Sequence, residues 1–126
     1  MIQSGKLKLR EHTVKSAYGD IVVVSLEGTV TLGKESVLLR DTLRERCDTV
    51  SSRILLDLED VTFMDSSGIG VLVELKAHAL HHMGDVRVCN CPSFVTRILF
   101  RLALHRILEV YETEDQALHA WGVPIS

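Results

Sequence analysis

Two adjacent serines, Ser66 and Ser67, are the residues best suited to chemistry, and they lie between Asp65 and Gly68. The apolar residues on either side predict a strand that leads into this segment and a helix that begins there. Serine and aspartate are favoured at helix N-termini, because their oxygens accept hydrogen bonds from free backbone N–H groups. The same N–H groups and the helix dipole also favour a phosphate. Two interpretations are therefore open: a capping turn, or a serine that can be phosphorylated with little damage to the fold.

A second group is formed by His78, His81 and His82, whose i, i+3, i+4 spacing can bind a metal ion on a helix. No cysteine or carboxylate at a convincing zinc spacing accompanies them in the sequence, so we expect a solvated helix face and no metal site.

The three cysteines, Cys47, Cys89 and Cys91, contain no C-x-x-C pair. We interpret them as small buried apolar residues.

Motifs typical of enzymes are missing from the sequence. The G-x-S-x-G nucleophile motif fails, because Met64 or Asp65 stands where glycine is required. Neither G-x-x-x-x-G-K-[ST] nor G-x-G-x-x-G after a strand occurs. We therefore expect no catalytic function and no cofactor, and we interpret Ser66 as a substrate of another protein's kinase.

The apolar pattern predicts the elements that must position these residues. Strands are expected over residues 7–14, 20–26, 53–58, 86–89 and 107–111, and helices over 34–50, 69–83, 92–104 and 114–121. The first strand is expected at a sheet edge, and Glu27-Gly28-Thr29 is expected to end the second. Strands that alternate with helices predict an α/β fold with parallel neighbours and right-handed crossovers.

The helix predicted over residues 69–83 has an apolar arc of about 200°, wider than one sheet face requires. Neighbouring helices could bury the surplus. Alternatively, Gly70, Val71 and Glu74, beside Ser66, could form part of a partner-docking patch.

Composition restricts the class of protein. The 126 residues suit one domain, residues 1–126, and carry 14 basic against 17 acidic side chains, a formal charge of −3. This balance argues against direct nucleic-acid binding, which needs a basic face. With no run of 18 apolar residues and no signal-peptide pattern at Met1, we expect no membrane insertion and a cytoplasmic location.

Residues 56–70, LDLEDVTFMDSSGIG, resemble the phosphorylation loop of anti-sigma-factor antagonists, a bacterial family with the STAS fold (sulfate transporter and anti-sigma-factor antagonist). The similarity extends through residues 92–118 and covers about residues 15–121. It implies a mixed, mostly parallel central sheet with an N-terminal edge strand and about four helices packed against it.

The resemblance also implies a function. The unphosphorylated protein would bind an anti-sigma factor with serine-kinase activity and so free a sigma factor for transcription. Phosphorylation at Ser66 would release that partner, a phosphatase would reset the switch, and ATP would belong to the kinase. The phosphorylation loop and partner-binding surface would comprise Asp65, Ser67, Gly68, Gly70, Val71, Glu74, Thr29 and Thr31.

One segment departs from the family pattern. Many antagonists carry acidic residues just after the glycine that ends the second strand, whereas this chain has Thr29 and Thr31. Two alternatives therefore stay open: a STAS interaction module outside sigma regulation, such as a stress-signalling scaffold or lipid-transport subunit, or a small enzyme.

Overall fold

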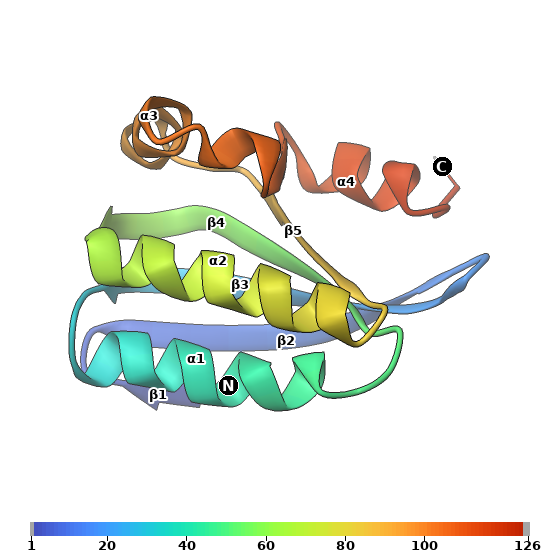
Figure 1. Cartoon of the computed structure of the whole chain (residues 1–126), viewed down its shortest axis with the longest axis horizontal. Coiled ribbons are helices and arrows are strands. Elements are labelled where there is room, and N and C mark those ends of the chain that lie inside the picture. Colours follow the sequence, from blue (N-terminus) through green and yellow to red (C-terminus); the bar gives the residue numbers. More distant parts are fainter. Residues whose placement is uncertain (1, 125–126) are drawn as a thin grey trace.

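The computed structural model describes residues 2–124, which form a six-stranded sheet with helices on both faces (Figure 1). The elements in chain order are β1 (Ile2–Ser4), β2 (Leu7–Ser16), β3 (Gly19–Val30), α1 (Lys34–Cys47), β4 (Arg53–Met64), α2 (Ser66–His81), β5 (Asp85–Cys89), α3 (Ser93–Arg101), the short 3₁₀ helix η1 (Leu104–Arg106), β6 (Glu109–Tyr111) and α4 (Glu114–Ala120).

The strands lie in the order β1-β2-β3-β4-β5-β6. β1, β2 and β3 pair antiparallel, whereas β3, β4, β5 and β6 are parallel neighbours. The expected edge position of the strand over residues 7–14 is only partly right, because β1 lies outside it. β1 pairs with Leu7–Leu9 of β2, and in the described part of the chain no strand pairs with residues 10–16 of β2 on that side.

The prediction that Glu27-Gly28-Thr29 ends the second strand is wrong. β3 continues to Val30, and the pairing with β4 shifts register between Gly28 and Thr29. Gly28 has a φ of 107°, and a Cβ there would collide with the Lys6 carbonyl oxygen. The glycine therefore marks a bulge inside the strand and not a turn after it.

β4 likewise continues to Met64, past its predicted end at Leu58. The extended parts of β3 and β4 pair with each other, with Thr29 opposite Phe63. These extensions carry the chain to the segment that holds the two serines.

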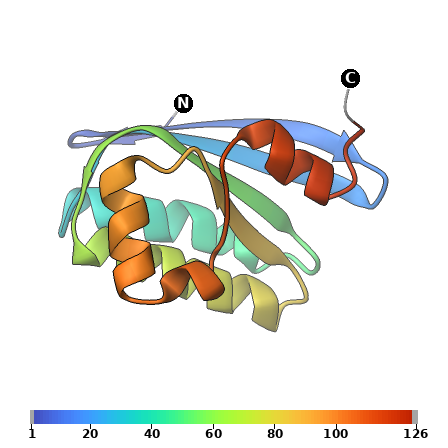
Figure 2. The same cartoon turned by 90° about the horizontal axis from the view of Figure 1, so that it is seen from above.

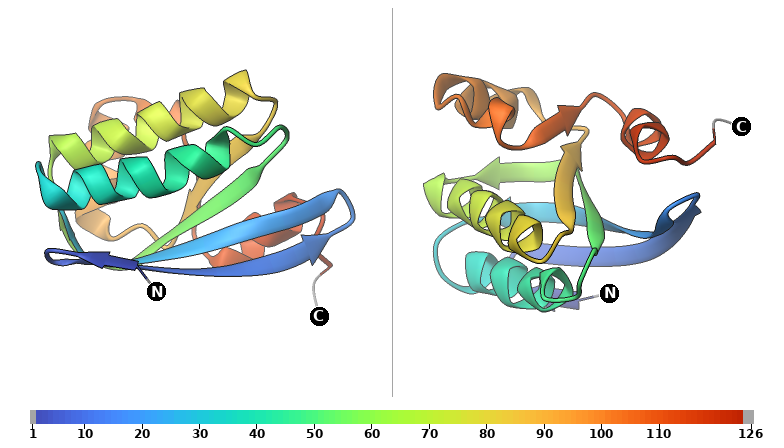
Figure 3. Two further views of the ribbon diagram at one scale, coloured as in Figure 1. Left: turned by 90° about the horizontal axis from the view of Figure 1, so that it is seen from below. Right: turned by 45° about the vertical axis from the view of Figure 1, so that its right-hand side comes forward.

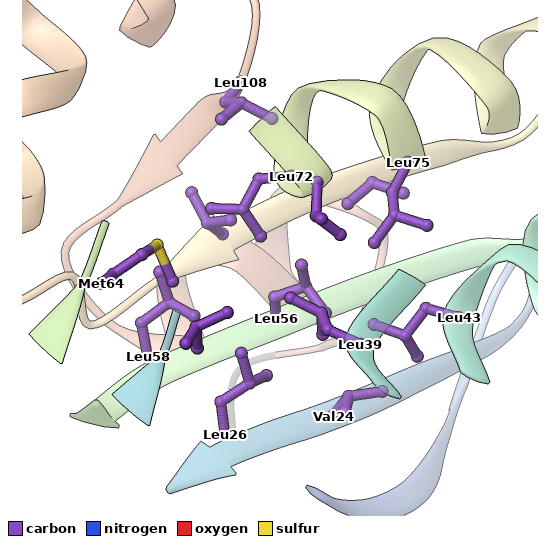
Figure 4. Close-up of a cluster of buried hydrophobic side chains, with 14 of the residues drawn as sticks. Val24, Leu26, Leu39, Leu43, Leu56, Leu58, Met64, Leu72, Leu75 and Leu108 are labelled. Carbon is purple, nitrogen blue, oxygen red and sulfur yellow. The ribbon is translucent and has the colours of Figure 1, made fainter. Parts of the chain in front are cut away.

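Both faces of the central strands are buried, which explains their continuous apolar sequences. On one face, Leu39 and Leu43 of α1 and Leu72 and Leu75 of α2 pack over Leu56 and its neighbours in one cluster (Figure 4). α3 joins this cluster through buried side chains.

On the other face, Ile21, Val23 and Leu55 pack against Leu118 and Trp121 at the end of the chain. Figure 2 shows α4 on the opposite side of the sheet from α1 and α2. The predicted α/β fold, a mostly parallel sheet with antiparallel N-terminal strands and four helices packed on it, is confirmed for residues 2–124. Within these residues no helix has the length and apolar character needed to cross a membrane.

Candidate functional site

The candidate site lies at the carboxyl ends of the two central parallel strands, β3 and β4, where α1 and α2 begin. Crevices at the carboxyl ends of parallel strands are the usual binding positions in α/β sheets. The two helices lie side by side and start at the same end of the molecule (Figures 1 and 3). The segments after Val30 and Met64 therefore meet there, although they are more than thirty residues apart in the chain.

Asp65 is the N-cap of α2. Its Oδ1 atom accepts hydrogen bonds from the backbone N–H groups of Ser67, at 2.9 Å, and Gly68, at 3.1 Å. The backbone of Asp65 is extended, with a φ of −93° and a ψ of −174°, as N-cap residues usually are. The capping interpretation is thus confirmed, with Asp65 as the cap and Ser66 as the first residue of the helix.

The second carboxylate oxygen of Asp65 accepts a hydrogen bond from the backbone N–H of Leu32, in the loop between β3 and α1, at 3.0 Å. Partial desolvation alone would raise the pKa of Asp65, but the N–H groups of Leu32, Gly68 and Ser67 outweigh it and lower this pKa below its ordinary value. Asp65 is therefore a carboxylate at neutral pH and holds two loops together.

Ser66 is exposed and Ser67 is half-buried, so Ser66 is the more accessible of the two serines. Gly68 is buried, and a Cβ on it would lie 2.8 Å from the carbonyl oxygen of Val30. The small residue lets the first turn of α2 approach the end of β3.

An apolar groove of about 420 Å³ adjoins Ser66. It lies between the start of α2 and the segment formed by the end of α3 and η1. Its lining consists of Met64, Asp65, Ser66, Ile69, Gly70, Val73, Ile98, Leu102 and Leu104. Leu102 is 57% exposed, so apolar surface lies open within reach of the serine.

Two expected members of a docking patch lie elsewhere. The placement of Val71 in such a patch is wrong, because its side chain is 1% exposed and packs in the core. Neighbouring elements bury this part of the wide apolar arc. Glu74 is exposed but faces α1, where it pairs with Arg40 at 3.1 Å and with Arg44 at 3.8 Å. Gly70 is the member that lines the groove.

Thr29 and Thr31, at the end of β3 and just after it, are half-buried beside this region. The hydroxyl of Thr31 donates a hydrogen bond to Glu35, in the first turn of α1, at 2.9 Å. A carboxylate therefore lies next to Thr31. The sequence pattern did not single out Glu35, because it lies four residues after Thr31, on the following helix.

The apolar pattern of the sequence also did not predict that Leu102 and Leu104 line the groove. The predicted helix over residues 92–104 ends at Arg101, and Ala103 adopts a left-handed conformation with a φ of 57°. This turn places Leu102 and Leu104 at the groove. The hydrogen bond from the backbone N–H of Leu32 to Asp65 could not be predicted from the sequence either, since any residue except proline supplies an N–H group.

Comparisons with known proteins agree with this architecture. The sequence model of the STAS domain matches residues 12–117. The chain is 33% identical over 75 residues to an anti-sigma F factor antagonist from Paenibacillus polymyxa. This match covers 60% of this chain and 61% of that protein, so the chain spans less than two thirds of the relative's length.

Two solved structures show the same fold. An anti-sigma factor antagonist from Mycobacterium paratuberculosis superimposes with a TM-score of 0.74 at 20% identity, over 90% of this chain and 92% of the other. The phosphorylated form of the Bacillus cell fate determinant SpoIIAA gives a TM-score of 0.66 at 19% identity, over 90% of this chain and 98% of the other.

Proposed function

Since the chain belongs to the STAS domain family, we propose that it is an anti-sigma factor antagonist that is switched by phosphorylation of Ser66. Unphosphorylated, it binds an anti-sigma factor with serine-kinase activity and frees a sigma factor. When it is phosphorylated, it releases the anti-sigma factor. It acts in the cytoplasm without a cofactor or catalytic activity of its own, since the kinase binds the ATP, and a phosphatase restores the serine.

The observation that carries the proposal is the position of Ser66. It is exposed, it is the first residue of α2, and it lies at the rim of an open apolar groove. A kinase can reach such a hydroxyl, and a bound partner would cover it. The names of the similar proteins, an anti-sigma F factor antagonist and a phosphorylated SpoIIAA, support the same role.

Electrostatics support the direction of the switch. A phosphoryl group adds about −1.5 to −2 charges beside the ionised Asp65. Within the domain, the N-terminus of α2 offsets this charge by about 0.3–2 kcal/mol. Under a bound partner, a buried charge without a counterion costs about 3–5 kcal/mol, which is more than about a hundredfold in affinity. The fold can therefore survive a modification that dissociates the complex.

The surface next to Ser66 supports protein binding. Leu102 in the groove and Leu32 in the loop before α1 are both largely exposed apolar side chains. Glu35, held by the hydroxyl of Thr31, supplies an acidic group where Thr29 and Thr31 replace the acidic residues of many antagonists. We propose that the partner contacts these three side chains and covers Ser66.

The test requires the cognate kinase, which a kinase-like anti-sigma gene in a neighbouring reading frame would identify. Purified protein is incubated with this kinase and ATP, and the phosphorylated residue is located by mass spectrometry. We expect transfer of the γ-phosphoryl group to the Ser66 oxygen with release of ADP. Ser66→Ala should abolish the transfer, and the matched variant Ser67→Ala should retain it.

Binding of the unphosphorylated protein to the kinase is measured in parallel. Ser66→Asp should weaken the affinity more than tenfold, whereas Ser67→Asp should weaken it less. Absence of phosphate at Ser66, together with wild-type affinity of Ser66→Asp, would reject the switch. Turnover of an ester or a nucleotide that Ser66→Ala abolishes would instead favour an enzyme.

A further inference from the structure

A second group of side chains, which could bind a metal ion, lies at the C-terminal ends of α1 and α2, away from Ser66. Asp48 is the C-cap residue of α1, and its Oδ1 atom is hydrogen-bonded to Nε2 of His78, in the last turn of α2. His82 is the C-cap of α2. The three side chains each offer one ligand atom, and these atoms lie within 4.8 Å of one another. The sequence pattern shows the histidines alone, because Asp48 lies thirty residues away on another helix.

The identity of the ligand atoms indicates which ions fit. Two imidazole nitrogens and one carboxylate oxygen suit Zn²⁺ and its first-row neighbours, whereas Mg²⁺ and Ca²⁺ prefer oxygen ligands alone. In a tetrahedral zinc site with bonds of about 2.0–2.1 Å, neighbouring ligand atoms lie about 3.4 Å apart. The present separations of up to 4.8 Å exceed this spacing, so side-chain rotation would have to bring the three ligand atoms closer together. The fourth position is left for water.

The orientation of His82 is already fixed. Its Nδ1 atom lies 3.0 Å from the backbone carbonyl oxygen of His78. A carbonyl oxygen only accepts, so Nδ1 carries the proton and Nε2 holds the free lone pair. Metal-binding histidines usually make such a hydrogen bond to a carbonyl or carboxylate, which fixes the tautomer and the ring orientation.

The backbone around the cluster favours a cation. α1 and α2 run side by side and end at the same side of the molecule, at the right of Figure 1. Each helix C-terminus carries a partial negative charge of about half an electron from its unpaired carbonyl groups. Two such ends converge on Asp48, His78 and His82. The nearby cation Arg44 is directed toward Glu74, at 3.8 Å.

We propose that Asp48, His78 and His82 bind Zn²⁺ or a chemically similar divalent transition-metal ion, which joins the C-terminal ends of α1 and α2. The ion would replace the direct hydrogen bond between His78 and Asp48, with His78 in the tautomer that leaves Nε2 unprotonated. The site lies a full helix length from Ser66, about 24 Å for the 16 residues of α2. The proposal is therefore independent of the proposed function.

The test uses full-length protein without a histidine tag, at about pH 7.5, where most imidazole groups are neutral. Zn²⁺ binding is measured by isothermal titration calorimetry, and the metal-induced rise in Tm is measured by thermal unfolding. We expect one ion per chain and a rise of several degrees. Asp48→Asn, His78→Ala and His82→Ala should each weaken binding by about tenfold or more, since even outer partners of metal ligands have effects of that size.

His81→Ala is the matched control, because His81 is exposed at the same end of α2 but lies outside the cluster. It should keep the wild-type affinity and the wild-type rise in Tm. Circular dichroism of each variant without metal checks that the helices are intact. Wild-type protein that binds no Zn²⁺ below about 1 mM would overturn the proposal. Equal loss in His81→Ala, or unchanged binding in the three ligand variants, would also overturn it.

Discussion

The carboxylate of Asp65 accepts a hydrogen bond from the backbone N–H of Leu32 across 33 positions of sequence, at 3.0 Å. The same side chain caps α2 through its other oxygen. One residue therefore fixes both the helix that begins with Ser66 and the loop that precedes α1. A change in charge at Ser66 acts directly beside this link.

Removing this link should lower stability in a pH-dependent way. Asp65→Ala should reduce the free energy of unfolding at pH 7 by about 0.5–2 kcal/mol, the usual effect of losing an N-cap. The pKa of Asp65 is lowered in the fold, so the carboxylate stabilises the protein above its unfolded pKa of about 3.9. That contribution is lost as the pH falls through the lower folded-state pKa.

Urea unfolding of both proteins from pH 7 down to about pH 3 checks this prediction. The difference between them should shrink at the acidic end. Asp60→Ala, at an exposed position of β4, serves as the control and should show little effect at either pH. A difference that stays constant with pH would show that the charge of Asp65 contributes nothing.

Two glycines in the first turns of α2 should respond oppositely to alanine. Gly68→Ala should destabilise the fold by about 1–3 kcal/mol, because the new methyl group would lie 2.6 Å from Cγ of Met64 and 2.8 Å from the oxygen of Val30. At Gly70 a Cβ meets nothing within 4 Å, so Gly70→Ala should stabilise by up to about 1 kcal/mol through helix propensity. Chemical denaturation measures the change in the free energy of unfolding for both variants. If Gly68→Ala stabilised the fold as Gly70→Ala does, the close approach at Gly68 would be contradicted.

Val71→Asp should unfold much of the protein. An unpaired charge in the core cluster costs about 3–5 kcal/mol, a large part of the stability of a typical domain. Ser66→Asp introduces the same side chain at an exposed helix N-terminus and should change the free energy of unfolding by less than about 1 kcal/mol. Thermal unfolding measures both. A folded Val71→Asp with near wild-type Tm would place this residue at the surface after all.

The cysteines should be unreactive while the protein is folded. Burial is the largest cause that raises the pKa of Cys47 to about 11 and that of Cys91 to about 12, and it also raises the pKa of Cys89. Because the thiolate is the reactive form, labelling at about pH 8 should be more than a hundredfold slower than for an exposed thiol. Cys47 and Cys89 are buried, whereas Cys91 is only half-buried, which corrects the interpretation of all three as buried residues. A thiol-reactive dye should still label all three rapidly only after denaturant is added; rapid labelling of the native protein would contradict the raised pKa values of the thiols.

Several elements were predictable because their signal is local. The apolar spacing predicted a helix over residues 34–50, which identified α1 although that helix ends at Cys47. The short β-branched and leucine-rich runs identified the cores of β3 and β4. The segment from Asp65 to Gly68 combined a good capping residue with a helix start. Such features depend on residues close together in the chain, so the sequence alone expresses them.

Other features depend on contacts between distant segments and were missed. Gly28 was interpreted as a strand end, because a bulge and a turn require the same positive φ. The exposure of the apolar arc of α2 could not be assigned, since it depends on which sides α1 and α3 cover. Periodicity places Val71 on an apolar face but does not say what packs there.

Because β1 is much shorter than β2, part of β2 can form backbone hydrogen bonds with a strand of another chain. Among residues 2–124, no strand pairs with residues 10–16 of β2 on the outer side, and an open edge of this length is a template for intermolecular strand pairing. This edge carries Arg10, Glu11, His12 and Lys15, and Arg46 at the end of α1 holds Glu11 by an ion pair. Charged side chains protect against aggregation through such an edge. The charges along this edge therefore disfavour pairing of β2 with the same strand of a second copy.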